Sequence, residues 1–100
     1  MEKDTDSYFY LKVSGNSMNQ KFQDGDYVLI KEQHDLENGD IGVFLVNGDD
    51  ATLKRYRRIN NELVLLEPMS SDPTYEPITV DLKKTTLKVL GKAVNYFGKI

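Results

Sequence analysis

Short apolar and β-branched runs, separated by turn-forming residues, cover most of the chain. Asparagine, aspartate, glycine and proline recur too often for a helical period to persist over three turns. The runs that predict strands are residues 8–13, 27–31, 41–46, 51–59, 63–66, 78–80 and 86–94. Several short strands with frequent turns are typical of a sandwich or a barrel, so the pattern predicts an all-β domain.

Two asparagine turns predict a three-stranded meander. Asn47-Gly48 separates the third and fourth runs, and both residues tolerate the positive φ of a hairpin turn. Asn60-Asn61 joins the fourth and fifth runs in the same way. The last run continues into the apolar Asn95-Tyr96-Phe97, which predicts a terminal edge strand. Because edge strands are often covered by a second copy, we expect a two-fold homodimer through this C-terminal segment.

The segment from Ser14 to Phe22 interrupts the strand pattern. Ser17 is followed by Gln20 at capping-box spacing, which predicts a short helical turn with Ser17 as its N-cap. A serine just after a glycine can also be a nucleophile, because nearby backbone N–H groups can stabilise an oxyanion. The spacing alone leaves both interpretations of Ser17 open.

A nucleophilic serine needs a base, and the chain offers a histidine and a lysine. The single histidine, His34, lies in a polar stretch and is expected at the surface. A lysine can serve if burial lowers its pKa toward neutrality. Lys54 is a candidate, because strand alternation puts it on one face with Thr52 and Tyr56. The alternative is an ordinary solvated lysine.

Composition narrows the function classes further. With 100 residues, the chain suits a single domain, and the lack of cysteine excludes disulfides, thiolate zinc sites and cysteine nucleophiles. The net charge of −3 argues against a broad DNA-binding face, so we interpret the basic run Lys54-Arg55-Tyr56-Arg57-Arg58 as a solvated strand. Asp24-Gly25-Asp26 lacks the further ligands of a calcium loop and predicts a turn. No metal or cofactor is expected.

The ends and the hydropathy predict where the domain lies and where the protein resides. Residues 1–7 are polar and are expected to be a tail or the stump of a linker, which leaves residues 8–100 as the domain. The acidic N-terminus is not a secretory signal, and no apolar run is long enough for a membrane helix. These features predict a cytoplasmic protein without a membrane contact.

Several motifs occur in the order found in one known family. They are Val13-Ser14-Gly15-Asn16-Ser17-Met18, Asp24-Gly25-Asp26 with the following strand, Asn38-Gly39-Asp40-Ile41, Ala51-Thr52-Leu53-Lys54-Arg55-Tyr56, Leu63-Val64-Leu65-Leu66-Glu67-Pro68, Pro77-Ile78 and Leu90-Gly91-Lys92-Ala93-Val94. In these motifs the chain resembles the C-terminal domain of LexA-type repressors, UmuD-type proteins and cleavable phage repressors. The resemblance covers almost the whole chain. It implies a LexA/signal-peptidase-like fold of short, highly twisted antiparallel strands.

The resemblance also implies an activity and its residues. Ser17 would be the nucleophile of a Ser/Lys peptidase, Lys54 the general base, and the backbone N–H groups of Asn16 and Ser17 the oxyanion donors. The implied substrate is an Ala-Gly or Cys-Gly bond upstream of the domain, a dipeptide that this chain does not contain. Signal peptidase shares the serine and lysine but has a membrane anchor, which makes it a poorer match.

The implied partners are those of a repressor. The domain would dimerise, an upstream helix-turn-helix absent from this chain would bind the DNA operator, and a RecA–single-stranded DNA filament would trigger cleavage in an SOS response or in phage induction. The alternative is a dimerisation module of a helix-turn-helix repressor that keeps the same fold and is never cleaved.

Overall fold

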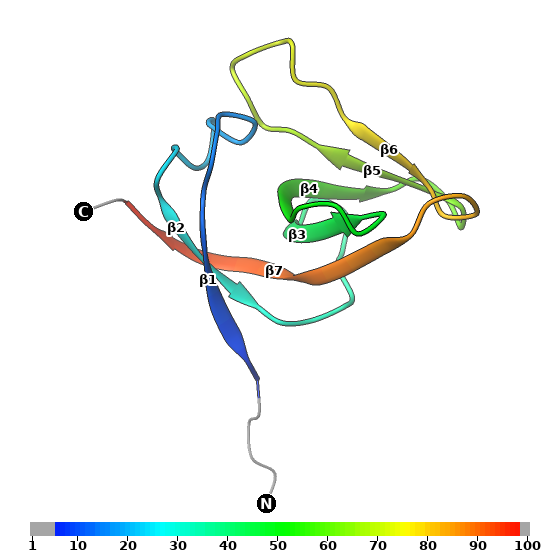
Figure 1. Ribbon diagram of the computed structural model, residues 1–100, viewed down its shortest axis with the longest axis horizontal. Helices are drawn as coiled ribbons and strands as arrows, with labels where there is room; N and C mark the ends of the chain where they lie inside the picture. The colour runs from blue at the N-terminus through cyan, green and yellow to red at the C-terminus, as the bar shows by residue number, and fades with distance from the viewer. Residues whose placement is uncertain (1–5, 99–100) are drawn as a thin grey trace, which may run out of the picture.

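Seven antiparallel strands form the architecture of the computed structural model, which describes residues 6–98 (Figure 1). The strands are β1 (Tyr8–Lys12), β2 (Tyr27–Lys31), β3 (Ile41–Val46), β4 (Thr52–Arg58), β5 (Leu63–Glu67), β6 (Ile78–Asp81) and β7 (Leu87–Phe97). The all-β prediction is confirmed. The described residues include no helix that could cross a membrane. The predicted tail, residues 1–7, lies outside these residues except for Asp6 and Ser7, and the Ser7 carbonyl accepts a hydrogen bond from the Glu32 N–H.

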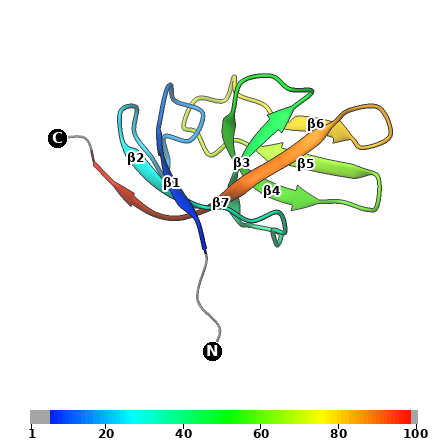
Figure 2. The ribbon, with the colours of Figure 1, turned by 60° about the horizontal axis from the view of Figure 1, so that its bottom comes forward.

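A single sheet contains all seven strands in the order β1-β2-β7-β3-β4-β5-β6. Figures 1 and 2 show it strongly twisted, with β1 and β2 at one end and β4, β5 and β6 stacked at the other. The prediction of a C-terminal edge strand is wrong for β7 as a whole, which pairs with both β2 and β3, although its last residues, 93–97, pair with β2 alone among the described strands. The edges are β1 and β6.

β7 is long enough to join both ends of the sheet. Its first part pairs with β3 up to Lys92, and its second part pairs with β2 from Lys92 to Phe97. The register shifts once against each neighbour, and such irregularities bend and twist a strand. Gly91 lies where the neighbours change, and a Cβ there would sit 2.5 Å from the Lys31 carbonyl oxygen. Only glycine permits this close approach of β2 and β7.

Two hydrophobic clusters form the core, one on each side of β3. The first packs β1, β2 and the segment after β1, and includes Val43 and Leu53. The second packs β3 to β6, and includes Phe44 and Tyr56. Consecutive strand residues point to opposite faces, so the neighbours Val43 and Phe44 belong to different clusters. β3 is therefore buried on both faces, although the chain is short.

The predicted meander of β3, β4 and β5 is confirmed, and β6 extends it. Asn47 and Gly48 have the expected positive φ values of 54° and 75°. Their turn does not close a tight hairpin, because β3–β4 pairing ends at Phe44 and Thr52. Beyond that point β3 stays with β7, and Val46 lies opposite Leu87. The hairpin therefore opens toward its turn.

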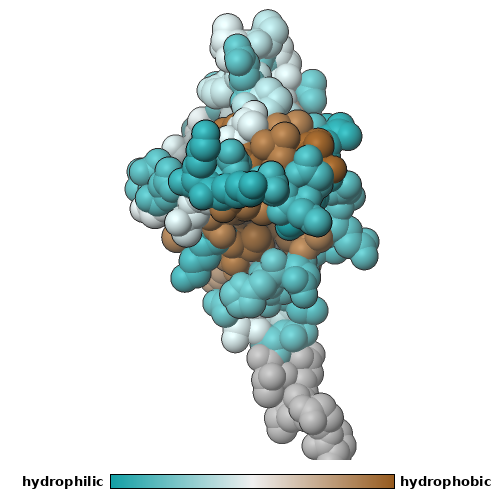
Figure 3. Space-filling model, turned by 90° about the vertical axis from the view of Figure 1, so that its right-hand side faces the viewer, coloured by the Kyte–Doolittle hydropathy of each residue, from teal (hydrophilic) through white to brown (hydrophobic). Residues whose placement is uncertain are grey.

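The second cluster is incompletely covered at the end of the molecule that carries the β6–β7 turn. Figure 3 views this end and shows apolar side chains surrounded by polar ones. A cavity of about 380 Å³ there is lined by apolar residues such as Leu36, Leu82 and Leu87 and by the polar His34, Asp35 and Arg58. The cleft that contains Ser17 and Lys54 lies on the other cluster, beside β1.

Candidate active site

The segment between β1 and β2 presents Ser17 on a tight turn. The Gly15 N–H donates to Asp24 Oδ1 at 2.8 Å and the Gly25 N–H to the Val13 carbonyl at 2.8 Å, so the turn closes on itself. Met18 and Phe22 fix it to the first cluster, since each is only 2% exposed. The predicted helical turn is a single turn, in which the Phe22 N–H donates to the Met18 carbonyl at 2.7 Å with α-helical spacing. The Asn19 and Lys21 N–H groups make tighter bonds of 3₁₀ spacing, to the Asn16 carbonyl at 3.2 Å and the Met18 carbonyl at 2.9 Å.

Ser17 does not cap this turn. Its Oγ accepts a hydrogen bond from Lys54 Nζ at 2.9 Å. The Gln20 N–H, which a capping serine would accept, donates to the Met69 carbonyl at 2.9 Å. The N-cap interpretation is therefore wrong, and the serine hydroxyl is directed toward β4.

Lys54 is a buried residue of β4. It is 8% exposed, so its interpretation as a solvated lysine is wrong. Besides Ser17 Oγ, its Nζ reaches Thr52 Oγ1 at 2.8 Å and the Leu53 carbonyl oxygen at 3.2 Å. Sequence reasoning put Thr52 on the same face as Lys54 but assigned it no role. The two-residue spacing along a strand is the signal that could have identified this contact.

The electrostatic surroundings of Lys54 favour its neutral form. Within residues 6–98 no carboxylate forms an ion pair with it. Burial therefore lowers the pKa of Lys54 below the ordinary value for lysine, since removing water penalises the charged form. A lysine in this state can accept a proton from the hydroxyl that it contacts.

A small cleft opens at this pair. It has a volume of about 110 Å³ and is lined on one side by residues 11–15, 17 and 18 and on the other by residues 51–54. Across the described chain, neither the Asn16 N–H nor the Ser17 N–H donates to a protein acceptor. Two N–H groups without a protein acceptor among residues 6–98, next to a serine hydroxyl that contacts a lysine, have the chemistry that an oxyanion requires.

The structure does not bring His34 to Ser17. His34 is exposed, as predicted, and lines a larger cavity of about 490 Å³ with residues such as Phe9 and Lys88. This larger cavity contains neither Ser17 nor Lys54, so its size does not mark the candidate site. No group of His, Cys, Asp or Glu in the described part of the chain could hold a metal ion. Asp24 instead accepts a hydrogen bond from the Gly15 N–H, and Asp26 accepts one from the Gln23 N–H.

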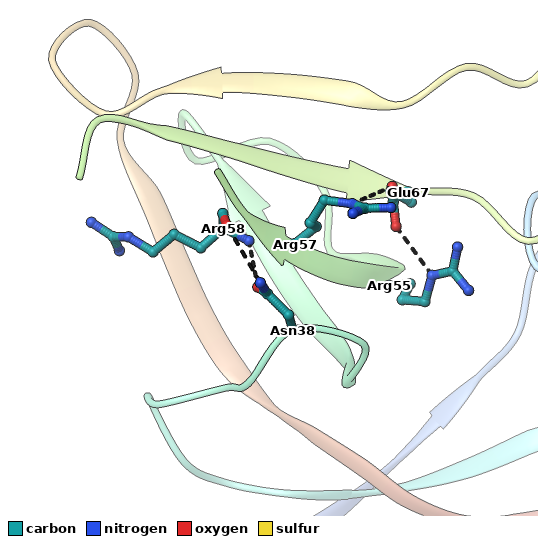
Figure 4. A network of polar contacts seen from close by, with 5 residues as sticks. All are labelled: Asn38, Arg55, Arg57, Arg58 and Glu67. Atoms are coloured by element: carbon teal, nitrogen blue, oxygen red, sulfur yellow. Dashed lines mark hydrogen bonds and ion pairs between the residues drawn. The ribbon is translucent and has the colours of Figure 1, made fainter. Parts of the chain in front are cut away.

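The arginines that follow Lys54 on β4 do not line the cleft. Figure 4 shows Arg55 and Arg57 reaching Glu67 on β5, with N–O distances of 3.1 and 2.9 Å, while Asn38 faces Arg58. Burial raises the pKa of the Glu67 carboxyl, but hydrogen bonds and positive charge from Arg57 and Arg55 outweigh it and leave the pKa below its usual value. The arginines are therefore engaged within the sheet.

Comparison with known proteins identifies the family. Residues 1–94 match the family model described as Peptidase S24-like. The chain belongs to this family. The LexA repressor of Petrotoga mobilis is 44% identical over 88 residues, which are 87% of this chain and 41% of that protein.

Other relatives carry the same name. The LexA repressor of Pseudothermotoga lettingae is 41% identical over 88 residues, or 87% of this chain and 42% of the relative. That of Brevibacillus brevis is 37% identical over 97 residues, or 96% and 44%. The chain thus spans less than half the length of these S24 relatives, and the resemblance to LexA-type C-terminal domains is confirmed.

Proposed function

We propose that this chain is the self-cleavage and dimerisation domain of a LexA-type transcriptional repressor, and that it acts as a Ser/Lys endopeptidase. The observation that carries the proposal is the 2.9 Å contact between Lys54 Nζ and Ser17 Oγ in a site where Lys54 has no carboxylate partner among residues 6–98. A purely structural lysine in a buried site would be expected to carry a counterion.

The reaction begins with neutral Lys54. Ser17 Oγ attacks the carbonyl carbon of the scissile peptide while its proton passes to Lys54 Nζ. The Asn16 and Ser17 N–H groups stabilise the resulting oxyanion. The C–N bond then breaks as the Lys54 ammonium gives its proton to the leaving amine, which leaves an acyl ester on Ser17. Water hydrolyses that ester, again with Lys54 as the base, and Ser17 is restored.

The hydrogen bonds of Lys54 orient it for this role. A neutral amine has two N–H bonds and one lone pair. Thr52 Oγ1 and the Leu53 carbonyl oxygen are acceptors for the two N–H bonds, at 2.8 and 3.2 Å. In this neutral form the 2.9 Å contact with Ser17 reverses its direction, and the Ser17 O–H donates to the lone pair of Nζ. We therefore assign Thr52 as a positioning residue for the base.

The substrate that we propose is an Ala-Gly-type bond in a segment upstream of the domain. Ala and Gly are small, which suits the cleft of about 110 Å³. The chain contains neither Ala-Gly nor Cys-Gly, so we expect it to be stable on storage and to cut only a supplied segment. Cleavage in trans will be inefficient, because tethering supplies an effective concentration of about millimolar that a separate segment lacks.

The second part of the proposal is a homodimer through the C-terminal part of β7. Pairing with β3 ends at Lys92, so in the described chain residues 93–97 have a strand neighbour only on the β2 side. Val94, Tyr96 and Phe97 are 44%, 45% and 47% exposed. A groove of about 210 Å³, lined by residues that include Lys21 and Ile41, runs beside this edge. A second copy can occupy it by adding its own β7 edge in antiparallel fashion.

Light scattering tests the dimer. We expect Val94→Lys to shift the protein to monomer at micromolar concentration, because a charge on an edge strand opposes pairing. Ile59→Lys is the matched control, since Ile59 is similarly exposed at 48% but lies in the β4–β5 turn. A wild-type protein that stays monomeric at high micromolar concentration contradicts the dimer.

The remaining partners follow from the names of the relatives. Because those relatives are LexA repressors and are more than twice as long, we propose that an upstream DNA-binding domain contacts the operator. A RecA–single-stranded DNA filament as the trigger stays a prediction of the resemblance, and a cytoplasmic location stays a prediction of the sequence.

A cleavage assay tests the peptidase. Wild type, Ser17→Ala and Lys54→Ala are each mixed with a longer form of the protein that carries the upstream segment and a Ser17→Ala substitution. We expect only wild type to release the product, at a rate that rises from pH 7 to 10 along one titration curve. Equal cleavage by all three, or binding without cleavage by wild type, contradicts the peptidase and favours the non-cleaving dimerisation module.

A further inference from the structure

Residues 68–71, which are distant in sequence, form hydrogen bonds with the turn that carries Ser17. The Met69 N–H donates to the Ser17 carbonyl at 2.8 Å, and the Gln20 N–H donates to the Met69 carbonyl at 2.9 Å. Met69 follows β5 and packs against the first hydrophobic cluster. The Ser17 turn is thus hydrogen-bonded on one side to Lys54 and on the other to residues 68–71.

Asn19 forms a second connection to the same segment. Its Oδ1 accepts the Ser71 N–H at 2.9 Å, and its Nδ2 donates to Ser71 Oγ at 3.3 Å. A primary amide that donates and accepts at once has only one suitable orientation, so the pair defines the relative position of the two segments. Gln23 Nε2 also donates to the backbone carbonyl of Asn19 at 2.7 Å, which helps to fix the asparagine backbone.

These contacts bear directly on the nucleophile. With its carbonyl held by Met69, Ser17 cannot rotate freely about ψ, and this limits where its Cβ and Oγ lie relative to Lys54. Both the attack of Oγ and its proton transfer need that position to within a fraction of an ångström. The segment after β5 therefore helps to position Ser17 relative to Lys54.

We infer that Asn19, through its paired contacts with Ser71, is a positioning residue that clamps the Ser17 turn onto residues 68–71 and so keeps Ser17 Oγ in reach of Lys54 Nζ. The inference rests on the proposed peptidase function. Asn19 touches neither reacting atom, so its effect is on geometry and not on the proton affinity of the base.

The test compares Asn19→Ala, Asn19→Asp and Ser71→Ala with wild type in the cleavage assay. Asn19→Ala is expected to lower kcat about 10- to 100-fold, because small misplacements of reacting groups cost rates of this size. The midpoint of its pH–rate curve should stay near that of wild type, since the surroundings of Lys54 are unchanged. Asn19→Asp keeps the Oδ1 acceptor for the Ser71 N–H and should restore most of the rate. Ser71→Ala keeps that N–H but removes the acceptor for Asn19 Nδ2, so it should lower kcat by less than Asn19→Ala does.

The matched control is Asn61→Ala. Asn61 is also a turn asparagine, exposed where Asn19 is half-buried, and its side chain makes no hydrogen bond to the described residues. Melting temperatures establish that each variant is folded at the assay temperature. If folded Asn19→Ala cuts as fast as wild type and Asn61→Ala, the positioning role is refuted while the peptidase stands.

Amide hydrogen exchange separates the two proposals when wild type itself does not cut. In Asn19→Ala the Gln20 and Met69 amides should exchange faster than in wild type, because both lie in the clamped contact. Unchanged protection of both amides refutes the clamp whatever the cleavage result. Absence of cleavage by wild type refutes the peptidase, and with it any catalytic use of the clamp.

Discussion

Two parts of β4 place positively charged side chains in opposite electrostatic environments. Lys54 is buried, contacts only neutral oxygen acceptors, and its pKa falls. The next residue, Arg55, lies on the opposite face of β4. Arg55 and Arg57 share the carboxylate of Glu67 there. There it is the pKa of the acid that falls. The same strand therefore holds a lysine whose amine can lose its charge and an ion network that keeps its charge.

The difference comes from the neighbours of each cation. A carboxylate beside a cation favours the charged states of both groups, whereas burial among neutral acceptors favours the uncharged amine. Arginine suits the first environment because its guanidinium stays protonated, and lysine suits the second because its pKa shifts readily. Strand alternation alone puts Lys54 and Arg55 in these two environments.

Replacing the base should have the largest effect. Lys54→Arg keeps a cation near Ser17 but cannot lose its proton below about pH 12, so cleavage should fall by about 10²- to 10⁴-fold between pH 7 and 10. Lys54→Met should lose a similar factor. Cleavage by Lys54→Arg within about threefold of wild type would show that Lys54 acts as a charge and not as a base.

A carboxylate placed beside Lys54 should keep its side chain charged, as the neighbouring arginines are. In Thr52→Asp the new charge favours the ammonium, so the midpoint of the pH–rate curve should rise by about 1–3 units. Activity at neutral pH then falls by about 10- to 1,000-fold and returns at high pH. Thr52→Val removes the hydrogen bond without adding charge, and should lower the rate without raising the midpoint. A midpoint that does not move in Thr52→Asp would contradict the assignment of the titration to Lys54.

Burying Lys54 should cost stability, and the cost should depend on pH. Its folded-state pKa lies below the unfolded value of about 10.4, so between the two values the unfolded chain binds more protons and stability rises with pH. Lys54→Met removes the cost and should stabilise the fold at pH 7 by about 1 kcal/mol, or roughly 4–8 °C in Tm. The gain should shrink as the pH approaches about 10. A variant less stable than wild type at pH 7 would mean that the ammonium is well solvated in the fold.

The arginine network should contribute least. Glu67→Gln should lower stability by about 0.5–1 kcal/mol, because both arginines are more than a third exposed and solvent screens the pairs. The folded-state pKa of Glu67 is lowered, so its contribution is present above the unfolded value of about 4.3 and is lost as pH falls through the folded value. Urea unfolding at pH 7 and pH 3 measures this. A difference that persists at pH 3 would point to packing and not to charge.

Local pattern predicted the elements well. β2 and β3 have the predicted bounds, and β4 differs from its predicted run by one residue at each end. Alternation and turn chemistry are properties of a few neighbouring residues, so they can be identified without the fold. The Ser17 and Lys54 pair was reached through the motifs of the family, because spacing alone also allowed a helix cap and a surface lysine.

Contacts between distant segments were decided by tertiary structure alone. Alternation says which face a residue occupies but not which strand lies beside it, so it could not show that β7 is central or that Val43 and Phe44 serve two different clusters. The Asn19–Ser71 contact joins residues 52 positions apart and leaves no local trace. Such pairings are set by how the whole sheet closes around its core, because each depends on burial that many strands provide together.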